Sequence, residues 1–457
     1  METPAQSRHG MWSSRWLFVL AAAGSAVGLG NIWKFPYITG ENGGGAFVIV
    51  YLLCIAFVGI PILAAEVMLG RAGRQSPINT MRTLTQRSAS GPAWVFIGWA
   101  GALAGFLILS YYSVIAGWAL YYIWLLANGT FEGVSAETAA AAFNGFLERP
   151  LLMTFWHGVF MAVTVFIVAR GVVKGLEAAI RWFMPLLFLL LVLLLVYAVN
   201  EGDFARGAAF MFDFRWDALG LDSVLIAMGQ AFFTLSLGMG AMMAYGAYVP
   251  ADASIGRTVI SVALLDTTVA IAAGLAIFPI VFANCLEPAQ GPGLMFVTLP
   301  LAFGHMPLGA LFGAFFFVLV GFAAITSSIS LTEPALAFLV EDYNAKRARA
   351  AISLGVICWA LGIGSTLSFN VWADVHVVGT FTIFDFVDYV TQNVMLPLGG
   401  LFIALFAGWV LPRAILREEL QLNGGWREAA TLVLVRVVSP LAVLAVFCFT
   451  LYQTFTG

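Results

Sequence analysis

Residues 24–36 read GSAVGLGNIWKFP, and they interrupt the first long apolar segment of the chain. Three glycines fall close together and are followed by Asn31 and Lys34. Each glycine in a helix costs about 1 kcal/mol relative to alanine, and a lysine inside lipid costs more. The stretch therefore predicts a membrane helix that is broken near its middle.

The composition excludes a soluble domain. The chain has 457 residues, of which 61% are hydrophobic and only 10% are charged, whereas soluble domains carry about 25% charged residues. Eleven segments reach the ~20 apolar residues that a membrane span needs, so we expect an all-α membrane protein with about 11 transmembrane helices. The expected spans are 16–40, 45–70, 92–127, 151–170, 176–199, 221–247, 258–283, 308–340, 348–368, 379–411 and 430–455.

The distribution of positive charge predicts the orientation. Most of the 21 Lys and Arg residues fall at one set of span ends. Only Arg149, Arg206 and Arg215 fall at the other set, and Lys34 lies within a span. Because cytoplasmic loops are rich in Lys and Arg, we expect a cytoplasmic N-terminus and an external C-terminus. Short external loops without a cysteine pair favour a bacterial inner membrane. The sequence contains no basic patch, so we expect no nucleic-acid partner.

A second segment, residues 229–245, reads GQAFFTLSLGMGAMMAY and is also interrupted by glycines and hydroxyls. The first and sixth spans each begin a set of five. Two glycine-interrupted spans at matching positions indicate a transporter binding site built on an inverted repeat, although the glycines could instead serve close helix packing. The expected divisions are a cytoplasmic tail at 1–11, repeats at 12–199 and 221–411, an external loop at 200–220, and an eleventh helix at 412–457.

Consecutive hydroxyls at residues 326–328, within the sequence AAITSSISLTEP, suggest an ion site in the eighth span. Neutral hydroxyl and carbonyl oxygens suit Na⁺ better than a transition metal. The four cysteines and four histidines have no metal-binding spacing. We therefore expect sodium and no organic cofactor.

These motifs resemble those of the neurotransmitter:sodium symporter family, which has the LeuT fold, with broken helices 1 and 6. The chain looks most similar to its bacterial eleven-helix branch, which transports hydrophobic amino acids. The resemblance rests on SAVGLGNIWKFPY (25–37), ENGGGAF (41–47), GIPILAAEVMLGR (59–71), GQAFFTLSLGMGA (229–241), TSSIS (326–330) and PLGGL (397–401).

The resemblance implies two sodium sites and one substrate site. One sodium site would use Gly24, Val27, Ala323, Thr326 and Ser327. The other would use Ala26, Asn31, Thr234, Asp266 and the substrate carboxylate. The substrate site would comprise Ser25, Ala26, Leu29, Gly30, Ile108, Tyr112, Phe232, Phe233, Thr234, Ser236, Met239, Ser327 and Leu331.

Three positions bear on specificity. Relatives that transport biogenic amines have an aspartate where this chain has Gly28, and that aspartate replaces the carboxylate that an amine lacks. The substrate of this chain should therefore have its own carboxylate. Met239 would allow a broad range of hydrophobic side chains, unless it is only a core residue. Chloride-dependent relatives have asparagine and serine where this chain has Asp266 and Ala270, so we expect chloride independence, with proton counter-transport through Asp266 left open.

The resemblance also implies gates. Lys34 would pair with Asp388 at the outer gate, unless Lys34 extends to the interface. The inner gate would consist of Trp12, Tyr248 and Glu341, together with a basic residue, which is either His9 or Arg8. Gly175 and Pro185 would let the inner end of the fifth helix unwind, unless they form only a static kink.

We therefore expect a sodium-coupled importer of neutral, mainly hydrophobic L-amino acids that works by alternating access. Its partners would be the amino acid, sodium ions and membrane lipid, and it would be a monomer or weak dimer. A proton-driven carrier or a carrier of another carboxylate-bearing substrate is the alternative. A channel would need a continuous polar stripe, and an intramembrane enzyme would need a catalytic motif, neither of which the sequence contains.

Overall fold

The computed structural model describes residues 10–287 and 292–456, and the regular structure in these ranges is helical. Nine helical spans there are long and apolar enough to cross a membrane, and a bent pair makes a tenth. The nine are Gly45–Gly73, Pro92–Ala127, Pro150–Ala169, Val172–Glu201, Ile255–Ala283, Gly309–Asp342, Arg347–Leu367, Ile383–Val410 and Trp426–Tyr452.

The bent pair is the opening stretch. Helix α1 (Arg15–Ala26) begins at Ser14, whose side chain accepts a hydrogen bond from the Leu17 amide. After residues 27–29 the chain continues as Gly30–Glu41, which includes α2 (Phe35–Glu41), at 71° to α1. The predicted break of the first span is confirmed.

The sixth predicted span, 221–247, is also broken. It forms α11 (Leu221–Thr234) and α12 (Ala241–Gly246), which are too short to count as spans by length. The break explains why ten spans meet the length criterion instead of eleven. Between the two helices Ser236, Gly238 and Gly240 have positive φ angles, which end the helix and which glycine adopts at little cost.

The other helices form the bundle and its caps. Two helices make up the second span, α3 (Gly45–Cys54) and α4 (Ile60–Gly73). The other spans contain α6 (Phe96–Ala127), α8 (Pro150–Ala169), α9 (Ala178–Glu201), α13 (Ile255–Ala283), α15 (Gly309–Asp342), α16 (Arg347–Leu367), α18 (Leu396–Leu405) and α21 (Ser439–Thr456). The short helices are α5 (Pro77–Arg87), α7 (Ala136–Leu147), α10 (Phe204–Phe212), α14 (Leu299–Gly304), α17 (Ile383–Tyr389), α19 (Arg413–Leu420) and α20 (Trp426–Val433).

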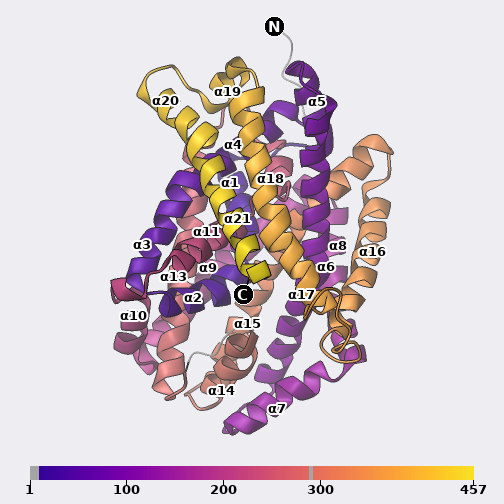
Figure 1. Ribbon diagram of the computed structural model, residues 1–457. Helices are drawn as coiled ribbons and strands as arrows, with labels where there is room; N and C mark the ends of the chain where they lie inside the picture. The colour runs from indigo at the N-terminus through magenta and orange to yellow at the C-terminus, as the bar shows by residue number, and fades with distance from the viewer. Residues whose placement is uncertain (1–9, 288–291, 457) are drawn as a thin grey trace.

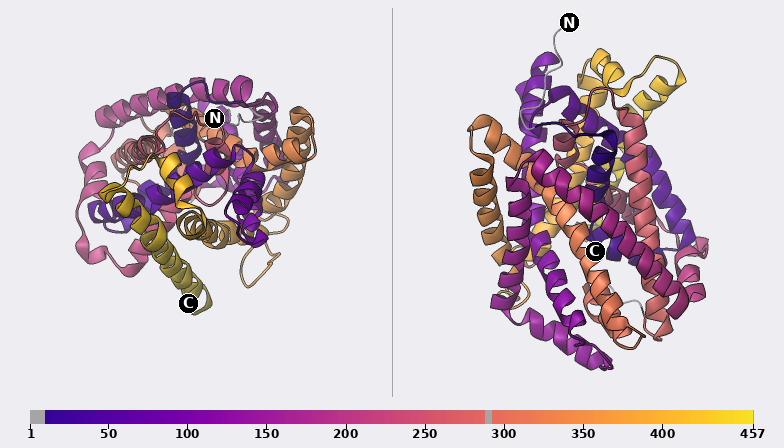
Figure 2. Two further views of the ribbon diagram at one scale, coloured as in Figure 1. Left: turned by 90° about the horizontal axis from the view of Figure 1, so that it is seen from above. Right: turned by 180° about the vertical axis from the view of Figure 1, so that it is seen from behind.

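Figure 1 shows α5 and α19 at one end of the bundle and α7 and α14 at the other. We call these the inner and outer ends, after the predicted orientation. Seen from above, the yellow C-terminal helix lies at the edge of the bundle (Figure 2). Only 22% of its most apolar stretch is buried, against 67% for α13. The two broken helices therefore lie within a core that α13 and α15 help to form, and the division into repeats stays a prediction.

Candidate functional site

The break after α1 exposes backbone carbonyls to α15. The Ser327 hydroxyl lies 3.2 Å from the Ser25 carbonyl oxygen, 3.4 Å from that of Val27 and 3.5 Å from that of Gly24. A Cβ atom added to Gly24 would lie 3.2 Å from the Thr326 Cβ. The structure thus brings together the residues predicted for one sodium site, and Thr326 donates to the Ala323 carbonyl oxygen at 3.0 Å.

The second predicted ion site surrounds a buried acid on α13. Asp266 is fully buried. Its carboxylate oxygens both lie 2.9 Å from the Thr234 hydroxyl. It also accepts from the Asn31 amide at 2.7 Å and from the Tyr51 hydroxyl at 3.4 Å. Within residues 10–287 and 292–456, all the hydrogen-bond partners of this carboxylate are neutral. A cation bound here would therefore supply the countercharge that the ionised carboxylate needs.

The Asn31 amide is oriented differently from the sequence expectation. Its oxygen accepts from the Gly28 amide at 3.0 Å. Its nitrogen donates to Thr234 and Asp266. A sodium ion between those two residues would face the amide nitrogen, so ion binding there requires the side-chain amide to turn over.

A cavity of about 30 Å³ lies between the two breaks, against α6 and α15. Eleven of the thirteen predicted substrate residues line it, together with Gly28 and Ser330. The two exceptions are Phe232 and Thr234. The Phe232 ring does not line the cavity as predicted but faces α18, where a Cβ atom added to Gly400 would lie 2.4 Å from it. Thr234 faces Asp266 instead. The eleven lining residues are Ser25, Ala26, Leu29, Gly30, Ile108, Tyr112, Phe233, Ser236, Met239, Ser327 and Leu331.

One end of this cavity carries an unsatisfied hydroxyl. The Tyr112 hydroxyl is buried and makes no hydrogen bond of good geometry among the described residues, although the Ser327 hydroxyl and the Leu29 backbone lie near it. A Cβ atom added to Gly28 would lie 3.3 Å from this hydroxyl and 3.0 Å from the Ser327 hydroxyl. Because a buried polar atom without a partner costs about 1–3 kcal/mol, this end of the cavity is suited to a polar ligand group.

The second break is held by an acid on α4. Glu66 is fully buried and accepts from the Gly238 amide at 3.1 Å. A Cβ atom added to Gly238 would lie 2.3 Å from the Leu396 carbonyl oxygen. Glycine is therefore required at this position both for its φ angle and for space.

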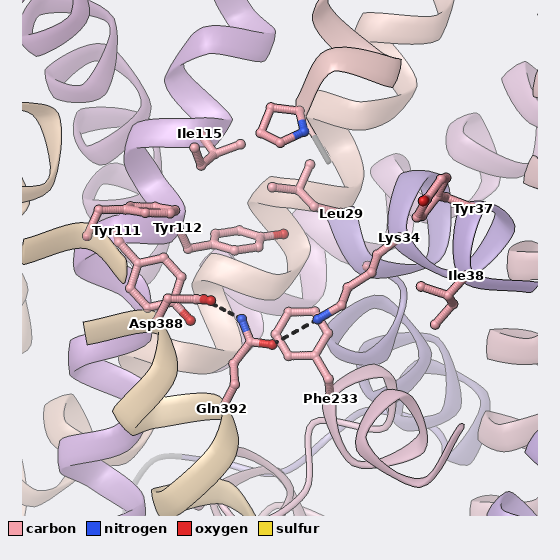
Figure 3. A pocket seen from close by; sticks show the side chains of 13 residues that line it. Leu29, Lys34, Tyr37, Ile38, Tyr111, Tyr112, Ile115, Phe233, Asp388 and Gln392 are labelled. Carbon is pink, nitrogen blue, oxygen red and sulfur yellow. Dashed lines mark hydrogen bonds between the residues drawn. The ribbon is translucent and has the colours of Figure 1, made fainter. Parts of the chain in front are cut away.

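On the outer side of the small cavity lies a vestibule of about 350 Å³, which Phe233 also lines. Lys34 projects into it with its ammonium group 5.5 Å from the Phe233 ring centroid. Figure 3 shows the Gln392 amide between Lys34 and Asp388. Lys34 donates to the Gln392 oxygen at 3.2 Å, and the Gln392 nitrogen donates to Asp388. The structure brings the predicted pair to one place but joins it through Gln392.

The inner end is closed by packed aromatic and charged groups. The Trp12 backbone amide donates to the Tyr248 carbonyl oxygen at 3.0 Å, and its indole N–H donates to the Tyr245 carbonyl oxygen at 3.3 Å. The Tyr248 hydroxyl donates to Glu333 at 2.7 Å. Glu333 also forms a two-pronged ion pair with Arg347 at 3.0 and 2.5 Å. These residues link α12, α15 and α16.

The other predicted gate residues lie near this end. Glu341 accepts from the Ser76 amide at 2.8 Å and from Asn79, at the start of α5. Arg8 and His9 lie outside the described residues. Gly175 belongs to a wound π-helical turn at Val172–Glu177, and Pro185 lies inside α9. The proposed unwinding of this segment stays a prediction.

Sequence reasoning missed three contributors to the site. Ser330 lines the cavity one helical turn after Ser327, and this spacing alone could have identified it. Glu333 lies at the end of the stretch AAITSSISLTEP, but the sequence alone does not identify its partner. Gln392 lies one turn after Asp388 and was missed because it has no charge.

The comparisons with known proteins agree on one family. The model of the sodium:neurotransmitter symporter family matches residues 9–131 and 140–456. An uncharacterized sodium-dependent transporter of Bacillus subtilis, YhdH, is 39% identical over 95% of this chain and 96% of its own length. One of Haemophilus influenzae is 32% identical over 96% and 98%.

A solved structure extends the likeness to three dimensions. The crystal structure of MhsT in complex with L-phenylalanine is 45% identical in sequence, with a TM-score of 0.88. The alignment covers 96% of this chain and 99% of that one. The helical architecture and the two breaks are those of the LeuT fold, and the relatives are transporters, which excludes the enzyme interpretation. The chain belongs to the sodium:neurotransmitter symporter family, and it is a sodium-dependent, multi-pass membrane symporter.

Proposed function

We propose that this symporter imports neutral, mainly hydrophobic L-amino acids across the bacterial inner membrane. The observation that carries the proposal is the cavity beside the first break. It combines an unpartnered Tyr112 hydroxyl and the space at Gly28 with apolar walls from Ile108, Phe233 and Leu331. A zwitterionic ligand with an apolar side chain satisfies both ends. The L-phenylalanine bound to the related MhsT supports the same substrate class.

Two sodium ions would accompany the substrate. The carbonyl oxygens around Ser327 form the candidate for one ion, and the Asp266 cluster forms the candidate for the other. A sodium ion at Asp266 would turn the Asn31 amide over and remove the acceptor of the Gly28 N–H. This N–H would then donate to the substrate carboxylate, so that each ligand binds more tightly when the other is present.

The same carboxylate supports chloride independence. Asp266 places a fixed negative charge beside the ion, where a chloride-dependent carrier needs an anion from solution. The chain would work by alternating access as a monomer or weak dimer, with its N-terminus in the cytoplasm. The concentration of Lys and Arg at one set of span ends supports this orientation.

Labelled leucine uptake into proteoliposomes tests the proposal. Uptake should require an inward Na⁺ gradient and persist when gluconate replaces chloride. Thr326→Ala and Asp266→Asn should each raise the Na⁺ concentration for half-maximal uptake by about tenfold, the effect of losing one charge-assisted ligand worth ~1.4 kcal/mol. Thr332→Ala is the matched control, because Thr332 is a buried hydroxyl of α15 that donates to the Ser328 carbonyl oxygen.

Uptake driven by a proton gradient alone would favour the alternative of a proton-driven carrier. Uptake that stops without chloride would contradict the role given to Asp266. Absence of uptake for every neutral amino acid would move the proposal to another carboxylate-bearing substrate.

A further inference from the structure

An apolar groove of about 510 Å³ opens on the perimeter of the bundle, between the inner halves of α6, α15 and α16. Its floor consists of Ile78, Ala102 and Phe338, which are at most 7% exposed and form a small hydrophobic cluster apart from the main core. Its walls include Leu103 and Ile357, each 53% exposed. Because α6, α15 and α16 belong to membrane spans, with α6 and α16 on one side of the bundle (Figure 1), the groove faces lipid.

The groove fits within one leaflet of the membrane. Along α6 its lining runs from Trp99 to Phe106, which is roughly 10 Å, and along α15 it runs from Ala335 to Tyr343, which is roughly 12 Å. Half of the ~30 Å hydrocarbon core is roughly 15 Å. The length of the groove therefore suits an acyl chain of an inner-leaflet lipid.

Two exposed aromatic side chains mark the inner end of the groove. Trp99 is 48% exposed and packs edge-on against Phe338, with the ring centroids 4.8 Å apart. Tyr343 is 69% exposed, and its ring centroid lies 6.1 Å from that of Phe338. Trp and Tyr are enriched where the hydrocarbon core meets the headgroups. The inner end of the groove therefore lies at headgroup depth.

Arg82 of α5 places a positive charge at the same end. Its guanidinium carbon lies 5.7 Å from the centroid of the Phe338 ring. Its Nη1 pairs with Asp342 at 2.7 Å and donates to Asn79 at 2.8 Å. Within residues 10–287 and 292–456, neither its Nε nor its Nη2 donates a hydrogen bond to the protein, and the side chain is 43% exposed. These two nitrogens can therefore donate to a phosphate oxygen.

Further positive charge surrounds this end of the groove. Lys346 directly precedes α16, and Arg349 lies in its first turn. Both are exposed, and neither forms an ion pair in the part of the chain that the structure describes. The acids here are Glu341 and Asp342, and Asp342 is paired with Arg82. Even with both acids counted, the three basic residues leave this rim with a net positive charge.

We propose that this groove binds an anionic phospholipid of the inner leaflet. One acyl chain lies along Phe338 and Leu103, and the phosphate meets the two remaining nitrogens of Arg82 and the ammonium group of Lys346. A zwitterionic phospholipid gains less, because its headgroup carries its own positive charge to the basic rim. A second copy of the chain is disfavoured as the occupant, because its own inner end would bring like charge to this rim.

Native mass spectrometry of the purified full-length protein tests the proposal. Delipidated protein in detergent receives equal amounts of dioleoylphosphatidylglycerol, which is anionic, and dioleoylphosphatidylcholine, which has the same chains and no net charge. The anionic lipid should be retained about tenfold more, as expected for one or two basic side chains beside its headgroup. Leu103→Trp should fill the groove and remove this preference. Leu189→Trp is the matched control, because Leu189 faces lipid on α9 with 54% exposure.

Charge variants test the rim of the groove. The double variant Arg82→Gln/Lys346→Gln should lower the retention ratio to about twofold or less. Arg257→Gln/Arg413→Gln is its control and should keep the ratio, because both arginines are exposed in the first turns of α13 and α19. Asp342→Asn also breaks the ion pair with Arg82, but it removes an acid from the rim, so it should raise the ratio.

Several results would overturn the proposal. One is equal retention of the two lipids, and another is a ratio that both double variants lower equally, since surface charge in general would then explain it. A ratio that falls in Asp342→Asn would mean that Arg82 acts only through its ion pair. A protein dimer that Leu103→Trp dissociates would assign the groove to a second copy of the chain. None of these results depends on which amino acid is transported.

Discussion

The two ends of the transport path are closed by different means. At the inner end, Glu333 is fully buried and Arg347 is 14% exposed. Tyr248 donates to Glu333 and packs against Trp12. At the outer end, one neutral amide, that of Gln392, connects Lys34 to Asp388 across a cavity of about 350 Å³. The structure is therefore closed toward the inner end and hollow toward the outer end.

This difference shows where opening is costly. Separating a buried ion pair leaves an uncompensated charge and costs several kcal/mol. Breaking an exposed contact costs at most about 1 kcal/mol, because water replaces it. The inner gate should thus need substrate binding or a large rearrangement to open, whereas the outer gate should fluctuate.

The largest effect is expected from Glu333→Ala. It leaves Arg347 buried without its partner, and we expect a loss of about 3–5 kcal/mol in the stability of the inner-closed state. Thermal unfolding and the alkylation rate of a cysteine placed at Ala244 measure this loss. The double variant Glu333→Leu/Arg347→Leu should recover the thermal stability. A single variant that unfolds and reacts like the unmodified protein would show that the pair does not hold the gate.

A smaller effect is expected from Tyr248→Phe. The ring stays in place and only the donor to Glu333 is lost, so the same two measurements should change by about 1.5–3 kcal/mol, the value of a hydrogen bond to a charged group. Tyr197→Phe serves as the control, because its hydroxyl also donates to the protein, at the Pro307 carbonyl oxygen. Equal losses in the two variants would deny Tyr248 a special role in the gate.

The smallest effect is expected from Gln392→Leu. It removes the bridge between Lys34 and Asp388, and substrate should dissociate outward up to about fivefold faster, corresponding to ~1 kcal/mol. Release of labelled leucine after dilution measures the rate. Asn393→Leu changes the neighbouring amide and should leave the rate unaltered. A change of fiftyfold or more for Gln392→Leu would mean that the two gates are equally strong.

Part of the site could be predicted because short stretches of sequence contain the residues that break helices and bind ions. Glycines beside Asn31 in an apolar segment, and hydroxyls at residues 326–328, indicated breaks and ligands without reference to any contact. The break positions follow from these short motifs, whereas the cavity residues were implied by the resemblance. The resemblance to a known family supplied the pairing of distant residues.

The different roles of the glycines could not be predicted. At the first break Gly28 provides space, since a Cβ atom there would approach Ser327 and Tyr112. At the second break Gly238 and Gly240 provide positive φ angles, at which other residues are strained. Sequence alone does not separate these reasons, because both appear as a glycine in an apolar segment.

Contacts between helices that are distant in the sequence could not be predicted either. The partners of Glu333 and the position of Gln392 depend on how α12, α15 and α16 pack and on how the chain at residues 390–395 faces Lys34. Phe232 was misplaced because neighbouring residues of a helix point about 100° apart, so Phe233 and Phe232 cannot both face the cavity.

The most direct test of this account asks whether sodium holds the inner gate closed. The carbonyl oxygens of Gly24 and Val27 meet Ser327 only while α1 lies against α15. Single cysteines at Ala244, which is buried, and at Ile115, which lines the vestibule, report the two ends in a chain without its native cysteines. Sodium should slow alkylation at position 244 without slowing it at 115, and Thr326→Ala should remove the effect. Faster alkylation at 244 in sodium would contradict the account.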